Sequence, residues 1–355
     1  MKKIVTNLYK TNLRTSMLKL IQKAPVILAA TLIMGSTTFI SAQELNPYEG
    51  YKIPPLEISA KNKYEYNYLD IFGSKMAYID EGKGDPILFI HGTPMSSYVW
   101  RNIMPHVENQ GRIIAPDLIG MGKSDKPDLK YTFDDQYKYL NAFIKKMNLK
   151  NITLVVHDWG SGLGLHYAHL NPDNIKGIVT MDAVLAPMQP AESYDSMSKV
   201  MGDYFRMIQT TEEGKKFLLD DNMVVEYEIP EMIDRPLKKE IHDVYREPYK
   251  TIESRTAVMQ WPLEVPVGGK PATTAKYISE YNAWLEKTDT PWLFLYATPG
   301  IMSTPAVADY WTERAQNIET VYIGNGLHFV QEDHPFAIGR AISDWYRRLN
   351  ASKSK

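Results

Sequence analysis

Short apolar runs that end at turn residues alternate along this chain with segments whose apolar residues recur at helical spacing. Four of these runs predict buried strands, at 87–90, 112–115, 152–156 and 175–181. Helical patterns follow the second and third runs, at 133–147 and 161–170. Strands that alternate with helices in this way predict an α/β fold with a doubly wound, mainly parallel sheet and right-handed crossovers.

The alternation stops between residues 186 and 267. This stretch has helical patterns at 196–209, 212–219 and 238–245 but no convincing buried strand, and it is rich in Met, Tyr and Pro. We therefore expect a helical cap, 186–267, inserted between two parts of one core, 43–185 and 268–355. Outside the cap, the pattern predicts a hairpin at 64–80, helices at 272–285, 305–315 and 335–349, and strands at 292–297 and 319–323.

The first 42 residues have the pattern of an export signal. They contain six Lys or Arg and no Asp or Glu, and the apolar run 24–34 is followed by small residues up to Ala42. We expect cleavage after Ala42 and a periplasmic or secreted protein. An uncleaved membrane anchor is the alternative, because 24–42 carries no charge, but the polar interruption at 35–38 makes it a weak span.

Charge and cysteine content narrow the classes of function. The net charge of the whole chain is −2, and removal of the six positive charges of the leader leaves −8. An acidic protein is a poor partner for nucleic acid or for anionic lipid, so neither is expected to bind. The absence of Cys excludes disulfides, a thiolate nucleophile and Cys-ligated metals.

The stretch from Leu154 to Gly160 is the most informative in the chain. Three apolar residues end a strand, and His157, Asp158 and Trp159 then precede a Gly and a new helix. A sharp strand-to-helix turn of this kind raises its central side chain above the carboxyl edge of the sheet. That side chain is Asp158, a carboxylate, which can attack a saturated or strained carbon and form an ester with the enzyme.

Further polar residues fall at the ends of other strands. In chain order these residues are Thr93, Asp158, Asp182 and His328, and the order nucleophile, acid, histidine is that of the α/β-hydrolase architecture. A histidine beside an ester can activate water, and a carboxylate on its other nitrogen sets its tautomer. We therefore expect these residues to meet at one edge of the sheet.

Two other patterns are given structural interpretations. His166 and His169 are three residues apart on a helix, but no third ligand accompanies them, so no metal is expected. Gly120 and Gly122 lack the strand-turn-helix context of a dinucleotide site.

Several of these runs resemble haloalkane dehalogenases of the α/β-hydrolase superfamily. The similar segments include 91–106, 116–127, His157-Asp-Trp-Gly-Ser161 and Gly326-Leu-His-Phe-Val-Gln-Glu-Asp333, together with the cap phrases 245–249, 261–262 and 268–271. The resemblance extends from about residue 50 to the end of the chain. Coelenterazine-type luciferases share much of it, and epoxide hydrolases share the His-Gly-x-Pro and His-Asp-Trp-Gly turns.

The resemblance implies a hydrolytic mechanism without cofactor or metal. Asp158 would displace halide from a small haloalkane, and His328, backed by Asp182, would direct water onto the resulting ester. The backbone amides of Thr93 and Trp159 would form the oxyanion hole. The Trp159 indole, with Thr93, would bind the halide.

Two positions depart from the branch whose cap is most similar. Thr93 occupies a place that is usually Asn, and Asp182 one that is usually Glu. A threonine hydroxyl is a single rotating donor on a shorter arm, so we expect either weaker stabilisation of the halide or a different substrate. Three alternatives therefore stay open: an epoxide hydrolase that uses cap tyrosines Tyr204, Tyr227, Tyr245 or Tyr249, a luciferase-like cofactor-free monooxygenase, and a non-catalytic small-molecule binding protein.

Overall fold

A single eight-stranded sheet forms the centre of the part of the chain that the computed structural model describes, residues 57–352. The export signal predicted at 1–42 lies outside these residues. The strands are β1 (Asn67–Ile71), β2 (Ser74–Glu81), β3 (Pro86–Ile90), β4 (Arg112–Pro116), β5 (Ile152–Asp158), β6 (Ile175–Ala183), β7 (Trp292–Pro299) and β8 (Ile318–Gly326). Their order across the sheet is β1-β2-β4-β3-β5-β6-β7-β8.

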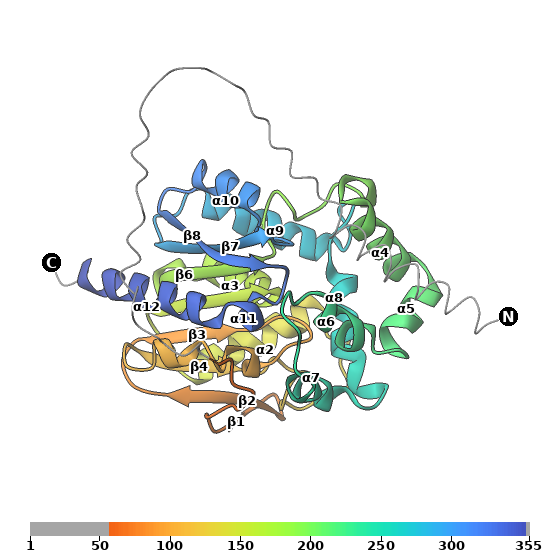
Figure 1. The fold of residues 1–355 in the computed structure, drawn as a ribbon, viewed down its shortest axis with the longest axis horizontal. Helices are drawn as coiled ribbons and strands as arrows, with labels where there is room; N and C mark the ends of the chain where they lie inside the picture. Colours follow the sequence, from red (N-terminus) through yellow and green to blue (C-terminus); the bar gives the residue numbers. More distant parts are fainter. Residues whose placement is uncertain (1–56, 353–355) are drawn as a thin grey trace, which may run out of the picture. The chain divides into compact units, whose positions relative to one another are not determined.

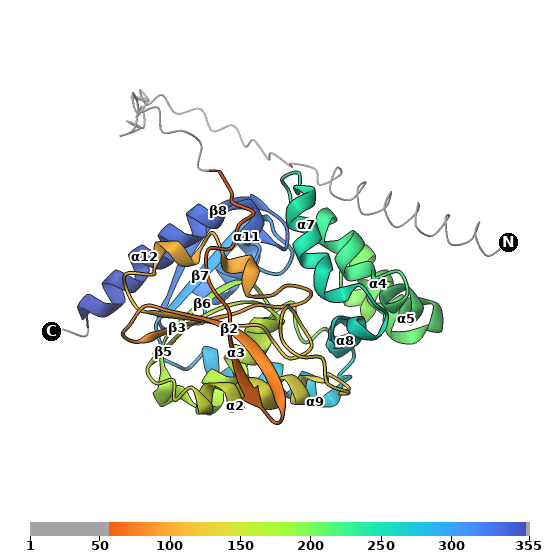
Figure 2. The ribbon, with the colours of Figure 1, turned by 90° about the horizontal axis from the view of Figure 1, so that it is seen from below.

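The sheet is mainly parallel, as the sequence pattern predicts. Only the two pairings β1–β2 and β2–β4 are antiparallel, and the five from β4–β3 to β7–β8 are parallel. Every residue of β3 and β5 is buried, because helices cover both faces. Helices α2 (Phe133–Lys146), α3 (Trp159–Leu170) and α9 (Ala272–Leu285) lie on one face, and α12 (Pro335–Ser352) lies on the other (Figure 2).

The last two strands are longer than their apolar runs predict. After a register shift following Tyr296, Thr298 pairs with Asn325 and Pro299 with Gly326. Apolar pattern could not reveal this extension, because the residues that continue the ladder are polar or small. Helix α10 (Pro305–Thr312), which lies between these two strands in the sequence, ends three residues before its predicted end at residue 315.

The cap gathers beyond the carboxyl ends of the parallel strands (Figure 1). Its helices α4 (Lys199–Thr210), α5 (Glu212–Leu219) and α7 (Lys239–Arg246) match the expected pieces. The sequence pattern missed a π-helical turn, η5 (Val224–Glu228), and the helices α6 (Ile229–Glu231) and α8 (Thr256–Glu264). Helix α8 contains Pro262. Because proline lacks a backbone N–H and usually ends a helix, the sequence does not predict a helix through this position, whereas in the structure the helix continues to Glu264.

A buried carboxylate, Glu332, fastens the cap to the core. It belongs to α11 (Val330–Asp333), and both its oxygens accept hydrogen bonds from the Arg101 guanidinium, at 2.6 and 2.9 Å. From the cap, Arg235 donates to Glu332 at 2.6 Å, and the Tyr245 hydroxyl donates as well. A buried carboxylate is tolerated only when opposite charges and hydrogen bonds compensate for its lost contact with water. The network therefore positions the cap beside the loop that carries His328.

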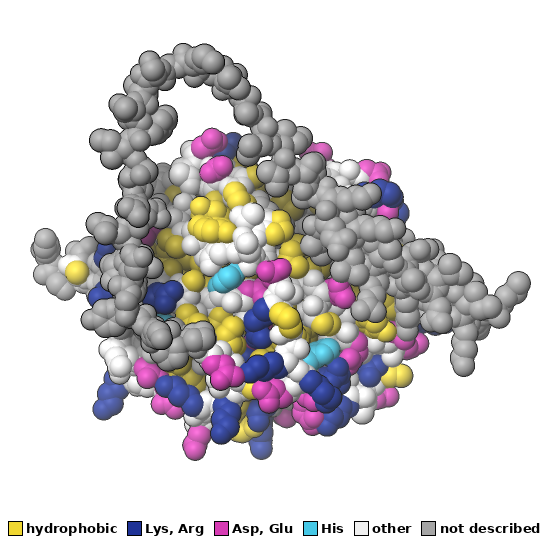
Figure 3. Space-filling view, viewed as in Figure 1, with side chains coloured by type: hydrophobic (Ala, Val, Ile, Leu, Met, Phe, Trp, Pro, Cys, Tyr) yellow, Lys and Arg dark blue, Asp and Glu magenta, His cyan; other side chains and the backbone are white. Residues whose placement is uncertain are grey.

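Two features bear on membrane and charge-driven contacts: the length and polarity of the helices, and the distribution of charge on the face in view. Within residues 57–352, no helix combines the length and the apolar character needed to cross a bilayer. Figure 3 shows acidic and basic side chains interleaved over one face of the molecule.

Candidate active site

Asp158 is held at a strained turn between β5 and α3. Its backbone has φ 48° and ψ −132°, a conformation that costs free energy for a residue with a side chain. The turn packs tightly against β3, since a Cβ on Gly160 would lie 2.2 Å from the carbonyl oxygen of Ile90. A Cβ on Gly92 would similarly lie 2.3 Å from Oδ2 of Asp158. Two glycines thus allow the carboxylate to lie where it does.

Backbone amides point at the Asp158 carboxylate. The Thr93 N–H donates to Oδ2 at 2.8 Å, and the Trp159 backbone N–H also donates to this side chain. Burial raises the pKa of Asp158 above its ordinary value, and the neighbouring His328 and these two amides partly offset that effect. Burial therefore removes water from the carboxylate, while the Thr93 amide already binds Oδ2 and the Trp159 amide also binds the carboxylate.

His328 lies between two carboxylates. Its Nδ1 is 2.5 Å from Oδ2 of Asp182, and its Nε2 is 3.8 Å from Oδ1 of Asp158. Burial lowers the pKa of His328, but the hydrogen bond and charge of Asp182, with the charges of Asp158 and Glu228, outweigh burial and raise it. Nδ1 is thus held by Asp182 while Nε2 faces the Asp158 carboxylate.

Asp182 is itself held by the backbone of the loop that follows β7. Its Oδ1 accepts hydrogen bonds from the amides of Ile301, Met302 and Ser303, at 3.3, 2.8 and 2.8 Å. The sequence shows that this loop has no carboxylate of its own. In the structure, three backbone amides of this loop instead hold the carboxylate of Asp182, which in turn pairs with His328.

Two further histidines orient the turns of the site. Nε2 of His157 lies 2.8 Å from the backbone oxygen of His328, and His91 accepts from the Leu118 amide at 2.9 Å. Burial lowers the pKa of both, so they are neutral hydrogen-bonding groups. The predicted structural role of His166 also fits, because its ring packs 4.1 Å from that of Tyr277 and burial lowers its pKa to about 4.

One cluster has the donor types of a metal site. Single ligand atoms of His157, Asp182 and His328 lie within 4.8 Å of one another. Nδ1 of His328 already pairs with Asp182, and Nε2 of His157 pairs with the His328 backbone. A metal would have to break these bonds, so the arrangement fits an Asp–His pair better than a metal centre.

Trp159 and Thr93, the two expected halide donors, flank the Asp158 carboxylate. The Trp159 ring is stacked on Trp261 of α8, with centroids 4.8 Å apart and planes 24° apart. The Thr93 hydroxyl is buried and has no hydrogen-bond partner among the described residues. Burying a hydroxyl without a hydrogen-bond partner costs free energy, unless a ligand or a water molecule supplies that partner. The Thr93 hydroxyl is therefore a candidate contact for a bound group.

The four cap tyrosines have different surroundings. The hydroxyls of Tyr245 and Tyr249 donate to Glu332 and to the Pro94 carbonyl, and the Tyr227 side chain is 40% exposed. Tyr204 is buried and donates to Glu228 at 2.5 Å. Glu228 is not among the residues predicted from the sequence. In the sequence it is one of three Glu residues, with Glu226 and Glu231, in the otherwise largely apolar stretch 223–233, and nothing local distinguishes it from the other two.

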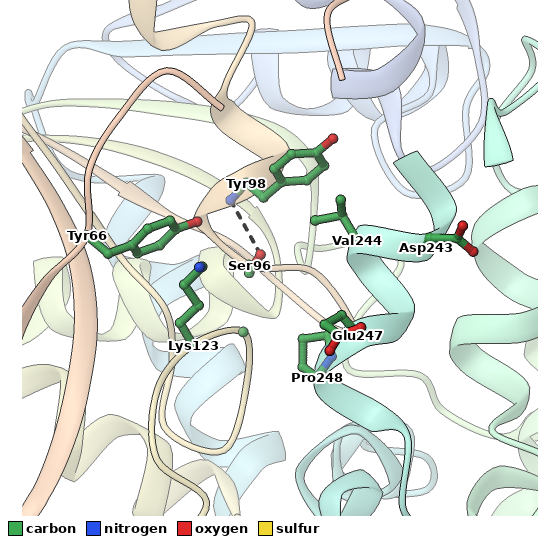
Figure 4. A pocket seen from close by; sticks show the side chains of 9 residues that line it. Tyr66, Ser96, Tyr98, Lys123, Asp243, Val244, Glu247 and Pro248 are labelled. Carbon is green, nitrogen blue, oxygen red and sulfur yellow. Dashed lines mark hydrogen bonds between the residues drawn. The ribbon is translucent and has the colours of Figure 1, made fainter. Parts of the chain in front are cut away.

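A hollow at the boundary of core and cap lies apart from this site. Its volume is about 410 Å³, and residues of the core face α7 and the residues that follow it across the hollow (Figure 4). The Lys123 ammonium lies 4.7 Å from the ring centre of Tyr66 there. No member of the Asp158–His328–Asp182 group lines this hollow, so it is not the chamber in which those residues act.

Comparison with known proteins places the chain in a family. Residues 85–335 match the family model described as the alpha/beta hydrolase fold. A haloalkane dehalogenase of Sphingobium indicum is 40% identical over 300 residues, which cover 83% of this chain and 99% of that protein. One from Mesorhizobium japonicum is 36% identical over 82% of this chain and 94% of the relative.

Solved structures agree. The crystal structure of a haloalkane dehalogenase from Bradyrhizobium elkani superposes with a TM-score of 0.78 at 36% identity, covering 81% of this chain and 99% of that one. Another, from Agrobacterium tumefaciens, gives a TM-score of 0.75 at 33% identity, over 82% and 98% of the two chains. With a carboxylate at its strand-to-helix elbow, a helical cap and these relatives, the chain belongs to the haloalkane dehalogenase family of the α/β-hydrolase fold.

Proposed function

We propose that this protein hydrolyses small haloalkanes to an alcohol and a halide through an ester on Asp158. The observation that carries the proposal is the carboxylate at the elbow, with His328 and Asp182 behind it and the Thr93 amide on one of its oxygens. A serine at the elbow would suit acyl transfer, whereas a carboxylate can displace a leaving group from a saturated carbon. The family relationship supports the same reaction.

The first step is an in-line substitution. Oδ1 of Asp158 faces His328 and is the oxygen free to attack, because Oδ2 accepts from the Thr93 amide. The new C–O bond forms as the carbon–halogen bond breaks, and the halide leaves with the electron pair. The Trp159 indole N–H and the Thr93 hydroxyl would stabilise the halide's developing charge.

The second step is hydrolysis of the ester. His328 takes a proton from water at Nε2, and the hydroxide attacks the carbonyl carbon of the ester. Oδ2, which becomes the carbonyl oxygen, then gathers negative charge against the Thr93 and Trp159 amides that already bind the side chain. Asp182 stabilises the imidazolium, and collapse of the intermediate releases the alcohol and restores the Asp158 carboxylate.

The overall reaction is tested by incubating the purified protein with 1-bromobutane and 1-chlorobutane and measuring halide and alcohol together. Equal amounts of the two products are expected. The proposal would be contradicted by release of alcohol without halide, or by release of neither product from any haloalkane in a panel of different chain lengths.

Thr93→Asn is expected to speed the halide-release step by up to roughly tenfold, if the longer amide adds about 1.4 kcal/mol in the transition state. Ester hydrolysis should change little, because it uses the backbone amide of this residue and not its side chain. Single-turnover kinetics on one bromoalkane separate the two steps. A variant no faster than wild type in halide release would show that the pocket is built around threonine for another leaving group.

A further inference from the structure

A polar pair in the cap, Tyr204 and Glu228, is not used by the mechanism above. Glu228 ends the π-helical turn η5, and its neighbours Val224, Val225 and Ile229 are buried apolar residues. The Tyr204 side chain is buried on α4, and its hydroxyl donates to Oε1 of Glu228 at 2.5 Å. Single-turn π-helices are frequent at functional sites, and this one places the Glu228 carboxyl group beside buried apolar residues of the cap.

The cap segment that carries Glu228 is hydrogen-bonded to the catalytic loop. The carbonyl of Met232, four residues after Glu228, accepts from the backbone amides of His328 and Phe329, at 3.2 and 3.1 Å. Glu228 is also close enough to His328 and Asp158 to interact electrostatically with both. It therefore belongs to the same cluster of groups as the proposed nucleophile and base.

The surroundings of Glu228 favour its protonated form. Burial raises its pKa above the ordinary value and the charge of Asp158 acts in the same direction, while the Tyr204 hydrogen bond and His328 act against them. The second oxygen, Oε2, has no hydrogen bond within the described residues, and the side chain is not fully buried. A neutral carboxylic acid can donate a proton, which an ionised one cannot.

We propose that Glu228 is a proton donor to a leaving oxygen, and that this site consequently opens epoxides as well as haloalkanes. A halide leaves without a proton. An epoxide oxygen departs as an alkoxide, a far poorer leaving group, unless an acid protonates it as the carbon–oxygen bond breaks. The inference uses the same nucleophile as the proposed function, and so it rests on that function.

The step balances without any co-reactant other than water. Asp158 attacks one ring carbon, the C–O bond of the ring breaks, and the oxygen takes the bond's electrons together with the proton of Glu228. The product is a hydroxyalkyl ester and an ionised Glu228. Water activated by His328 then hydrolyses the ester to a diol, and the proton that His328 has taken is returned to Glu228 directly or through solvent.

The structure also favours Glu228 over the cap tyrosines as this donor. Tyr245 and Tyr249 donate their protons to Glu332 and to the Pro94 carbonyl, and Tyr204 donates its own to Glu228. Burial raises the pKa of Tyr204 well above its usual range, which makes it a weak acid. Tyr204 is then a positioning residue that orients the carboxyl group of Glu228.

The test compares diol release from 1,2-epoxyhexane with bromide release from 1-bromohexane. Wild type is expected to yield both products. In Glu228→Gln the ratio of the diol rate to the bromide rate should fall by about a hundredfold, because an amide cannot transfer the proton. Bromide release from the same preparation shows that the variant is folded. Asp158→Ala should release neither product.

The matched control is Glu226→Gln, in the same turn. Glu226 pairs with Arg246 at 2.6 Å, and both side chains are partly exposed. This control should keep the ratio of the two rates within about twofold of wild type. Bromide release without diol from wild type, or an unchanged ratio in Glu228→Gln, would overturn the inference alone. Release of neither product from wild type would overturn the proposed function with it.

Discussion

Replacing Asp158 with Ala is expected to lower halide release by a factor on the order of 10⁵ or more, toward the rate without enzyme. The loss is large because the nucleophile takes part in both steps. No ester can form without it, and the amides of Thr93 and Trp159 and the imidazole of His328 then have nothing to act on. Halide release from a bromoalkane, measured at high enzyme concentration, gives the residual rate.

The variant should remain folded. Asp158 lies at the end of β5, where its positive φ is a strain that alanine inherits, and the lost carboxylate was itself buried at a cost. We expect the melting temperature to stay within a few degrees of that of wild type, because loss of the buried charge and loss of its hydrogen bonds oppose each other. Turnover that survives in a folded variant would rule out Asp158 as the nucleophile.

Replacing His328 with Phe is expected to stop the reaction after its first half. The carboxylate can still displace halide, but no base remains to activate water, so one equivalent of halide should appear and the alkyl ester should accumulate. Mass spectrometry of the intact protein should show the mass of the alkyl group added to nearly every molecule. Digestion should place the added mass on the peptide that contains Asp158.

His169→Phe is the matched control for this change. His169 lies on α3, where its ring packs 6.3 Å from that of Trp284, away from the triad. It should turn over with no lasting adduct. If His328→Phe binds substrate yet carries no adduct, or carries it on another residue, the two-step ester mechanism is wrong.

The positions of the main site residues could be predicted from the chain because each lies at, or just after, the carboxyl end of a strand. Asp158 and Asp182 end buried runs, and parallel strands bring their carboxyl ends to one edge of the sheet. His328 was predictable only through its loop after β8, together with the order of the residues. Local apolar pattern and strand topology were enough for this part of the site.

The supporting groups were not predictable in the same way. The amides that hold Asp182 belong to backbone and leave no trace in residue type. Glu332 and Arg101 are 231 residues apart, and nothing local marks them as partners. Glu228 is only one of three Glu residues in the otherwise largely apolar stretch 223–233, and its proximity to His328 depends on how the cap docks.

The arrangement of His328 between two carboxylates has a consequence for timing. Before reaction, the negative charge of Asp158 is one of the influences that raise the pKa of the His328 imidazole. Once Asp158 has become an ester that charge is gone, and the pKa of His328 should fall, which frees Nε2 to act as a base. Formation of the ester on Asp158 is thus expected to favour the neutral form of His328, which is the form that can take a proton from water.

The pH at which ester hydrolysis reaches half its maximal rate should accordingly lie below the pH at which His328 titrates in the free enzyme. Single-turnover rates give the first pH, and NMR titration gives the second. Coincident midpoints would mean that Asp158 exerts no such control.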